Sequence, residues 1–76
     1  MENTLCVAKV LYDMYYEQKG VQMDEMKMHK LMYFSQRESL MYNNEPLFDG
    51  TFYGWKYGPV LKEVRSVYMT EALFQM

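Results

Sequence analysis

Apolar positions along the chain recur at helical spacing in three segments. In residues 3–19 they follow an i, i+3, i+4, i+7 pattern, and charged side chains form the opposite stripe. Asn3 or Thr4 is placed to cap this first predicted helix, and Gly20 supplies a left-handed end. The pattern indicates an amphipathic packing helix whose inward residues are Val7, Ala8, Leu11, Met14 and Tyr15.

Residues 24–42 predict a second, longer helix, with Asp24 as its N-cap. This segment is apolar on two opposite faces, which is typical of a central helix that touches several neighbours. Only two other helices and one hairpin are available to cover it, so we expect further polypeptide to pack on this domain. One face carries Met28, Leu31, Met32, Ser35 and Tyr42, the other carries Met26, Tyr33 and Leu40, and Phe34 and Met41 lie at one flank.

After a polar turn at residues 43–45, the dipeptide Asp49-Gly50 predicts a two-residue type I′ turn between hairpin arms at 47–48 and 51–57. Such a turn needs a positive φ at Gly50. Pro59 then favours the start of a third helix, which runs to residue 68 or beyond. Its expected inward residues are Val60, Leu61, Val64, Val67 and Tyr68, and the apolar tail 71–76 is expected to continue the helix or to dock.

The predicted fold class is therefore mainly α, with one small β-hairpin and three helices in a compact domain around the central helix 24–42. Half of the 76 residues are apolar, among them nine Met, eight Tyr, four Phe and one Trp. A chain this short buries only about 60% of its unfolded surface. Met and aromatic side chains provide adaptable contact area. We expect an aromatic core together with a surface that meets a partner protein.

Charge and cysteine content set the broad class. The net charge is −2, which gives no overall attraction to a phosphate backbone. Cys6 is the single cysteine, so an intramolecular disulfide is excluded and a reducing, cytoplasmic location is favoured. No apolar run approaches membrane-spanning length, and no signal-peptide pattern is present.

The sequence contains little that indicates catalysis. His29 and Cys6 are the only nucleophile and base pair to consider, and no third group is indicated to orient them. We expect His29 to be a surface or half-buried hydrogen-bonding residue. One His, one Cys and scattered carboxylates do not supply a metal site, and no phosphate-binding glycine loop is present. No catalytic residue, metal or cofactor is predicted.

Nucleic-acid binding is a weaker alternative. Lys27, Lys30 and Arg37 share a broad wedge of the second helix, and Lys56 lies between aromatic residues that could stack on single strands. However, Glu38 interrupts the wedge and the net charge is negative. A solvated face, on which lysine stems cover apolar surface, fits these residues better.

Protein binding fits the composition better, because aromatic residues and Arg carry much of the energy of interfaces. The candidate binding residues are Tyr33, Arg37, Tyr53, Trp55, Lys56 and Tyr57. For Trp55 the sequence favours a core position over an interface position, because one Trp buries a large area in so small a domain.

Two motifs add a resemblance. Residues 23–36 (MDEMKMHKLMYFSQ) resemble the opening helix I-T-x-L-K-L-Q-K-L-L-Y-Y-A-Q of the Panacea antitoxin domain family, which is SocA-like. Residues 46–48 and 55–60 match the P-L-F and W-x-Y-G-P-V signatures of that family. His29 replaces the usual Gln, and Arg37-Glu38 replaces a small residue followed by an aromatic one. The matching positions include Lys27, Lys30, Leu31, Gln36, Gly58 and Pro59, most of them with an expected architectural role.

The resemblance implies a non-enzymatic bacterial or phage protein that neutralises a cognate toxin by direct binding. Family domains commonly have further helices after the third, so residues 1–76 are expected to be the N-terminal half of such a domain or a minimal version. A homo-oligomer is a further possibility. The alternative function is a phage-encoded inhibitor that occludes a host defence complex. The identity of the neighbouring genes would distinguish between these two roles.

Overall fold

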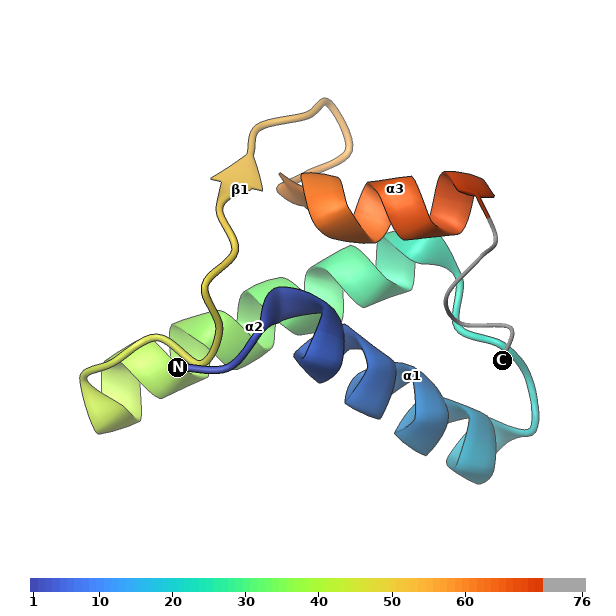
Figure 1. Cartoon of the computed structure of the whole chain (residues 1–76), viewed down its shortest axis with the longest axis horizontal. Helices are drawn as coiled ribbons and strands as arrows, with labels where there is room; N and C mark the ends of the chain where they lie inside the picture. Colours follow the sequence, from blue (N-terminus) through green and yellow to red (C-terminus); the bar gives the residue numbers. More distant parts are fainter. Residues whose placement is uncertain (71–76) are drawn as a thin grey trace.

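The computed structural model describes residues 1–70, which form three helices and a two-stranded antiparallel hairpin. The elements are α1 (Thr4–Lys19), α2 (Glu25–Asn43), β1 (Phe52–Tyr53), β2 (Val60–Leu61) and α3 (Lys62–Thr70), as Figure 1 shows. The predicted fold class is therefore confirmed. The prediction for the tail 71–76 lies outside the described residues.

Both long helices begin at predicted capping residues, and α1 also ends at the predicted Gly20. Asn3 caps α1, where its side-chain oxygen accepts hydrogen bonds from the N–H groups of Leu5 and Cys6 at 2.9 and 3.3 Å. Gly20 ends α1 with a left-handed φ of 74°. Asp24 caps α2 by accepting from the N–H of Lys27 at 2.8 Å. These local signals were readable because each cap lies within three residues of the groups it satisfies.

The predicted position of the hairpin turn is wrong. Phe52 pairs with Leu61 and Tyr53 with Val60, so the hairpin loop spans residues 54–59 and not Asp49-Gly50. Phe48 forms an isolated parallel bridge with Glu2 near the N-terminus, not a hairpin arm. The predicted start of the third helix at Pro59 is also wrong. Pro59 precedes strand β2, and α3 begins at Lys62.

Asp49 and Gly50 serve another purpose. The Asp49 carboxylate accepts hydrogen bonds from the Thr4 hydroxyl at 2.8 Å and from the Thr4 N–H at 3.1 Å. Gly50 has no positive φ, but a Cβ there would lie 2.6 Å from the Thr4 hydroxyl oxygen and 2.9 Å from a Leu61 methyl group. Glycine is needed at this position because the start of α1 and strand β2 approach its backbone closely.

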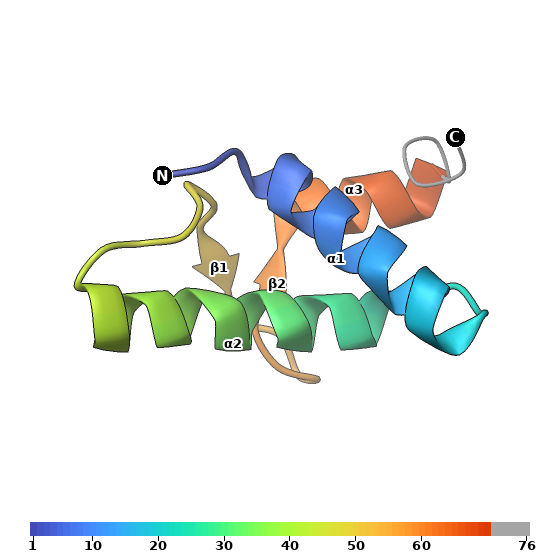
Figure 2. The ribbon, with the colours of Figure 1, turned by 90° about the horizontal axis from the view of Figure 1, so that it is seen from below.

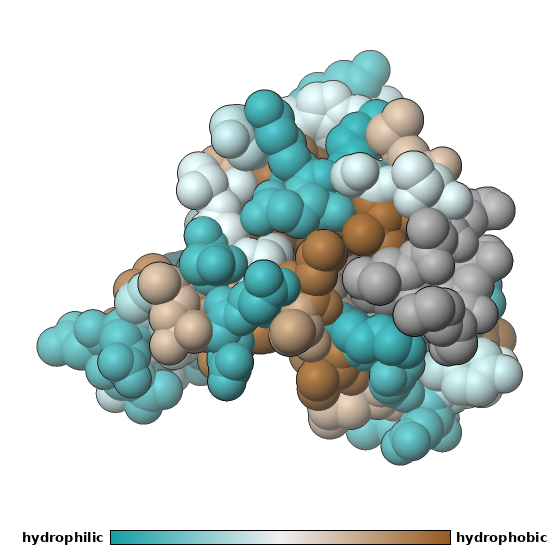
Figure 3. Space-filling view, in the orientation of Figure 1, coloured by the Kyte–Doolittle hydropathy of each residue, from teal (hydrophilic) through white to brown (hydrophobic). Residues whose placement is uncertain are grey.

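The core lies where the three helices and the hairpin meet. Its buried apolar residues are Ala8, Tyr12, Met23, Met28, Met32, Phe48, Leu61 and Val64, with Val7, Leu11, Tyr15, Leu31, Leu47, Phe52, Val67 and Tyr68 half-buried around them. Figure 3 shows apolar residues gathered at this junction, and mainly polar residues on the projecting end of the molecule. The inward residues predicted for the third segment are therefore confirmed, although Val60 and Leu61 belong to a strand.

The central helix is covered on one side more than on the other. Figure 2 shows α1 and α3 on one side of α2, and the loop between β1 and β2 reaching past α2 to its other side. Met28 and Met32 face the core and are fully buried. Tyr42, which was predicted to share their face, is 76% exposed because it lies in the last turn of α2, and the chain turns away after Asn43. Met26, Phe34, Leu40 and Met41 are about half exposed or more, so α2 retains uncovered apolar surface. That further polypeptide packs on it stays a prediction.

Candidate protein-binding groove

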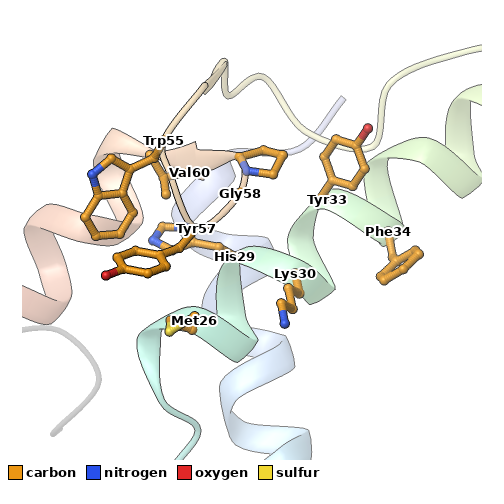
Figure 4. A pocket seen from close by; sticks show the side chains of 10 residues that line it. Met26, His29, Lys30, Tyr33, Phe34, Trp55, Tyr57, Gly58 and Val60 are labelled. Atoms are coloured by element: carbon orange, nitrogen blue, oxygen red, sulfur yellow. The ribbon is translucent and has the colours of Figure 1, made fainter.

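An apolar groove of about 370 Å³ lies between α2 and the loop that joins the two strands. Figure 4 shows the loop residues Trp55 and Tyr57 next to each other, with Tyr57 near Met26 of α2, and with Lys30 and then Phe34 further along the same helix. Ten residues line the groove: Met26, His29, Lys30, Tyr33, Phe34, Trp55, Tyr57, Gly58, Pro59 and Val60. Both longer sequence motifs, in residues 23–36 and 55–60, therefore meet at one place.

The helical side of the groove follows from the second apolar stripe of α2. Met26, Tyr33 and Phe34 each lie three or four residues from Lys30, so they project from the same broad face as Lys30. Tyr33 contacts Phe34 and Phe52 edge-on, at ring-centroid distances of 6.5 and 5.4 Å. The side chains of Met26 and Phe34 are half exposed or more. This face is apolar and open to solvent.

The loop side is held by a tight turn. The Gly58 N–H donates to the Trp55 carbonyl at 2.9 Å, and Gly58 has a φ of 119°, which glycine adopts without steric cost. The turn brings the rings of Trp55 and Tyr57 edge to face at 5.2 Å. Lys56 extends over the Tyr57 ring, 5.0 Å from its centroid. The two aromatic rings thus form a paired wall that the backbone fixes.

A chain of polar contacts connects this wall to α2. The His29 ring accepts a hydrogen bond at Nδ1 from the Leu61 N–H, at 3.3 Å, so its proton is on Nε2, which lies 3.0 Å from the Glu25 carboxylate. That carboxylate also accepts from Arg65 at 3.2 Å. The Arg65 guanidinium lies 4.7 Å above the Trp55 ring, a cation–π geometry. Both ring nitrogens of His29 therefore have a partner, and Arg65 contacts both the Glu25 carboxylate and the Trp55 ring.

His29 is only 4% exposed, more buried than the sequence predicted. The Leu61 N–H, which lies 32 residues away along the chain, provides a partner for the buried ring, and the sequence pattern could not reveal this contact. Both ring nitrogens are engaged, so neither is available to activate Cys6, which is exposed on α1. Within residues 1–70, no three His, Cys, Asp or Glu side chains lie close enough together to hold a metal ion.

Gln36 links the third motif, Pro46-Leu47-Phe48, to α2. Its Oε1 accepts hydrogen bonds from the N–H groups of Leu47 and Phe48 at 2.7 and 3.2 Å, and its Nε2 donates to the Phe48 carbonyl at 3.0 Å. The side-chain amide therefore takes the place of a neighbouring β-strand for this segment. Ser39 adds a hydrogen bond to the Glu45 carbonyl at 2.8 Å.

A second, shallower hollow of about 310 Å³ continues along α2. Arg37, Leu40, Met41 and Gln36 line it together with Tyr33 and Phe52. Tyr33 is shared by both hollows. The two hollows therefore form one apolar surface that follows the exposed face of α2.

The structure brings together three of the six candidate binding residues, namely Tyr33, Trp55 and Tyr57. Arg37 lines only the second hollow, and Tyr53 lies outside both, under the ammonium group of Lys62 at 4.6 Å. Trp55 is 42% exposed, so the core position favoured by the sequence is wrong: Arg65 and Tyr57 contact its ring, but the loop keeps it outside the core.

Among the motif residues, Lys30, Gly58 and Pro59 line the groove, and Gln36 holds the segment after α2. Leu31 packs against the core, and Lys27 lies 5.7 Å from the Tyr15 ring centroid on α1. Met26, Phe34 and Val60 line the groove but were not among the candidates. The outward apolar stripe of the second helix was the signal for the first two of these.

No helix within residues 1–70 combines the length and the apolar character needed to cross a bilayer. Neither the curated proteins nor the solved structures gave a match to this chain. Residues 28–74 match the family described as Antitoxin SocA-like, Panacea domain, which confirms the resemblance carried by the sequence motifs. The matched region covers more than half of the chain and includes nearly all of the groove. The chain therefore belongs to the family of antitoxin SocA-like proteins that carry the Panacea domain.

Proposed function

We propose that this protein is a non-enzymatic antitoxin that acts in the bacterial cytoplasm and neutralises a cognate toxin by direct binding through the groove. The observation that supports this most is the convergence of two separate family motifs on one exposed apolar surface. Met and aromatic side chains fill the core of this chain, yet others of the same types remain exposed at the groove. Exposed apolar surfaces of this kind mark sites of interaction with other proteins.

The aromatic wall is the proposed centre of the contact. Trp55 and Tyr57 are 42% and 56% exposed, yet the turn and Arg65 already hold their rings. A partner that buries them loses little side-chain entropy on binding, which is a property of energetically dominant interface residues. Tyr33 and Phe34 extend the same surface along α2.

The test is co-expression with the product of the neighbouring gene, followed by co-purification and a growth assay. Tyr57→Ala is expected to weaken the complex about 30-fold, equivalent to about 2 kcal/mol, and to restore toxicity. Tyr16→Ala is the matched control, because Tyr16 is 52% exposed on α1 outside the groove. Urea unfolding of each variant verifies that the fold is retained.

Neutralisation that survives Tyr57→Ala and Trp55→Ala together, in folded protein, would contradict the groove as the binding site. Absence of any complex with the neighbouring product would contradict the antitoxin role. No observation favours the alternative role as an inhibitor of a host defence complex, and binding to such a complex in place of a toxin would replace the proposed function.

A further inference from the structure

The exposed face of α2 carries positive charge as well as apolar surface. Lys30 and Arg37 lie seven residues apart, two helical turns, and are therefore on the same side. Both side chains are exposed, and neither forms an ion pair with another described residue. They lie among the apolar side chains of the two hollows, which are Met26, Tyr33, Phe34, Leu40 and Met41.

Among residues 1–70, no carboxylate lines either hollow. Of the acidic residues on α2, Glu25 accepts hydrogen bonds from His29 and Arg65, so its charge is compensated from within the chain. Glu38 follows Arg37 in the sequence but lines neither hollow. Lys56 adds a third cation beside the Tyr57 ring. The groove is thus an apolar surface with positive charge along it, although the chain as a whole has a net charge of −2. Its complement is apolar and acidic.

The dimensions of the surface indicate the form of the partner. The two hollows run from Met26 to Met41, which along a helix corresponds to about 22 Å. This is the length of a helix of about 15 residues, or four turns. The side-chain ridges of α2, formed by residues spaced by three and four, have the geometry that fits into the grooves of a second helix. The loop carrying Trp55 and Tyr57 forms the side wall for such a helix (Figure 4).

We infer that the groove binds an amphipathic α-helix of the partner protein, whose apolar side chains fill the two hollows and whose carboxylates face Lys30 and Arg37. The inference rests on the proposed function and specifies the chemistry of the partner. A second copy of this chain is a poorer occupant. Two-fold pairing through this face brings Lys30 and Arg37 of one copy against the same two cations of the other, and no carboxylate of residues 1–70 lines the two hollows to compensate them.

The probe is a displayed library of helical peptides of about 15 residues, with leucine on one face and randomised residues on either side of it. The library is selected on the wild-type chain, on the Lys30→Glu/Arg37→Glu variant and on the Lys9→Glu/Lys19→Glu variant. The last is the matched control, because it makes the same charge change on α1, outside the groove. Because the chain has a single tryptophan, Trp55 fluorescence reports binding at the groove.

The wild type and the α1 control are expected to enrich Asp and Glu beside the leucines. The groove variant is expected to bind these peptides at least about tenfold more weakly, with a smaller dependence on salt. A proline in the middle of a selected peptide is expected to abolish binding, because it breaks the helix. Failure to select any binder, neutral or basic flanking residues, or retained binding of the proline peptides would each overturn the inference.

Self-association has a separate readout. A dimer in sedimentation experiments that Tyr57→Ala converts to a monomer would show that a second copy occupies the groove, and would overturn the inference. Different experimental results would contradict the inference and the proposed function. Selection of acidic helices by a chain that neutralises no toxin removes only the antitoxin role. A toxin complex unaffected by Lys30→Glu/Arg37→Glu removes only the acidic helix.

Discussion

The side-chain amide of Gln36 forms two hydrogen bonds with the main chain of Phe48, accepting from its N–H at 3.2 Å and donating to its carbonyl at 3.0 Å. The Phe48 ring is buried in the core. One side chain of α2 therefore determines where the following segment enters the core, and with it the path toward the hairpin. This relationship connects Gln36 with the Pro46-Leu47-Phe48 segment, two places at which the sequence resembles the family motifs.

Replacing Gln36 by Ala is expected to lower the free energy of unfolding by about 2 to 3 kcal/mol, because three main-chain groups lose their partner in a half-buried site. Urea unfolding monitored by circular dichroism measures this. Gln18→Ala, at an exposed position of α1, is the control and is expected to change the value by less than about 0.5 kcal/mol. Equal effects of the two substitutions would show that the Gln36 contacts add no stability.

Gly50→Ala is expected to destabilise the chain by about 1 to 3 kcal/mol, because the new Cβ would lie 2.6 Å from the Thr4 hydroxyl oxygen and 2.9 Å from Leu61. Gly54→Ala is the matched control, since its Cβ would meet nothing within 4 Å and its φ is not positive. Thermal unfolding of both variants gives the comparison. A Gly50→Ala protein as stable as the Gly54→Ala protein would contradict the close approach of Thr4 and Leu61 to Gly50.

The Asp49 contact makes stability depend on pH in the acidic range. Hydrogen bonds from the Thr4 side chain and main chain lower the pKa of Asp49 below its ordinary value of 3.8. The unfolded chain therefore binds this proton more readily, so the stabilising contribution is complete above about pH 4 and is lost as the pH falls through the folded-state pKa. The urea midpoint of the wild type is expected to decrease more steeply over this range than that of Thr4→Val. Parallel pH profiles would contradict this.

His29 is expected to tolerate Gln better than Leu. A leucine leaves the buried Leu61 N–H without an acceptor, at an expected cost of about 1 to 3 kcal/mol, whereas a glutamine carbonyl can still accept from it. Chemical unfolding of His29→Gln and His29→Leu ranks the two variants. If His29→Leu is the more stable of the two, the hydrogen bond to β2 is not what retains a polar residue here.

Local chemistry made much of the fold predictable. The caps Asn3 and Asp24 and the stop at Gly20 act on groups a few residues away, so their signals are complete within the sequence. The prediction of a turn at Asp49-Gly50 is wrong because both residues pack against Thr4, which is 45 residues from Asp49 along the chain. The prediction of a helix start at Pro59 is wrong because the next residue, Val60, pairs with Tyr53 across the hairpin. In each case a contact with another segment, distant for Thr4 and across the hairpin for Val60, overrode the local preference.

The groove was predictable in part for the same reason. The outward stripe of the second helix and the aromatic residues near 55–57 were visible in the sequence, and Tyr33, Trp55 and Tyr57 line the same groove. That they meet depends on the turn closed by Gly58 and on the contact between Arg65 and Trp55, which join separate elements. The exposure of Trp55 follows from this geometry and not from its residue type.

The central claim, that a partner protein binds at this groove, is tested most directly by fluorine NMR. The chain has one tryptophan, so incorporation of 5-fluorotryptophan into this chain alone gives a single resonance that reports on Trp55 in the presence of any partner. On formation of the complex with the neighbouring gene product, we expect this resonance to shift and to lose its sensitivity to the solvent isotope, because the ring becomes buried. A complex that forms while the resonance remains unchanged and solvent-exposed would contradict the claim.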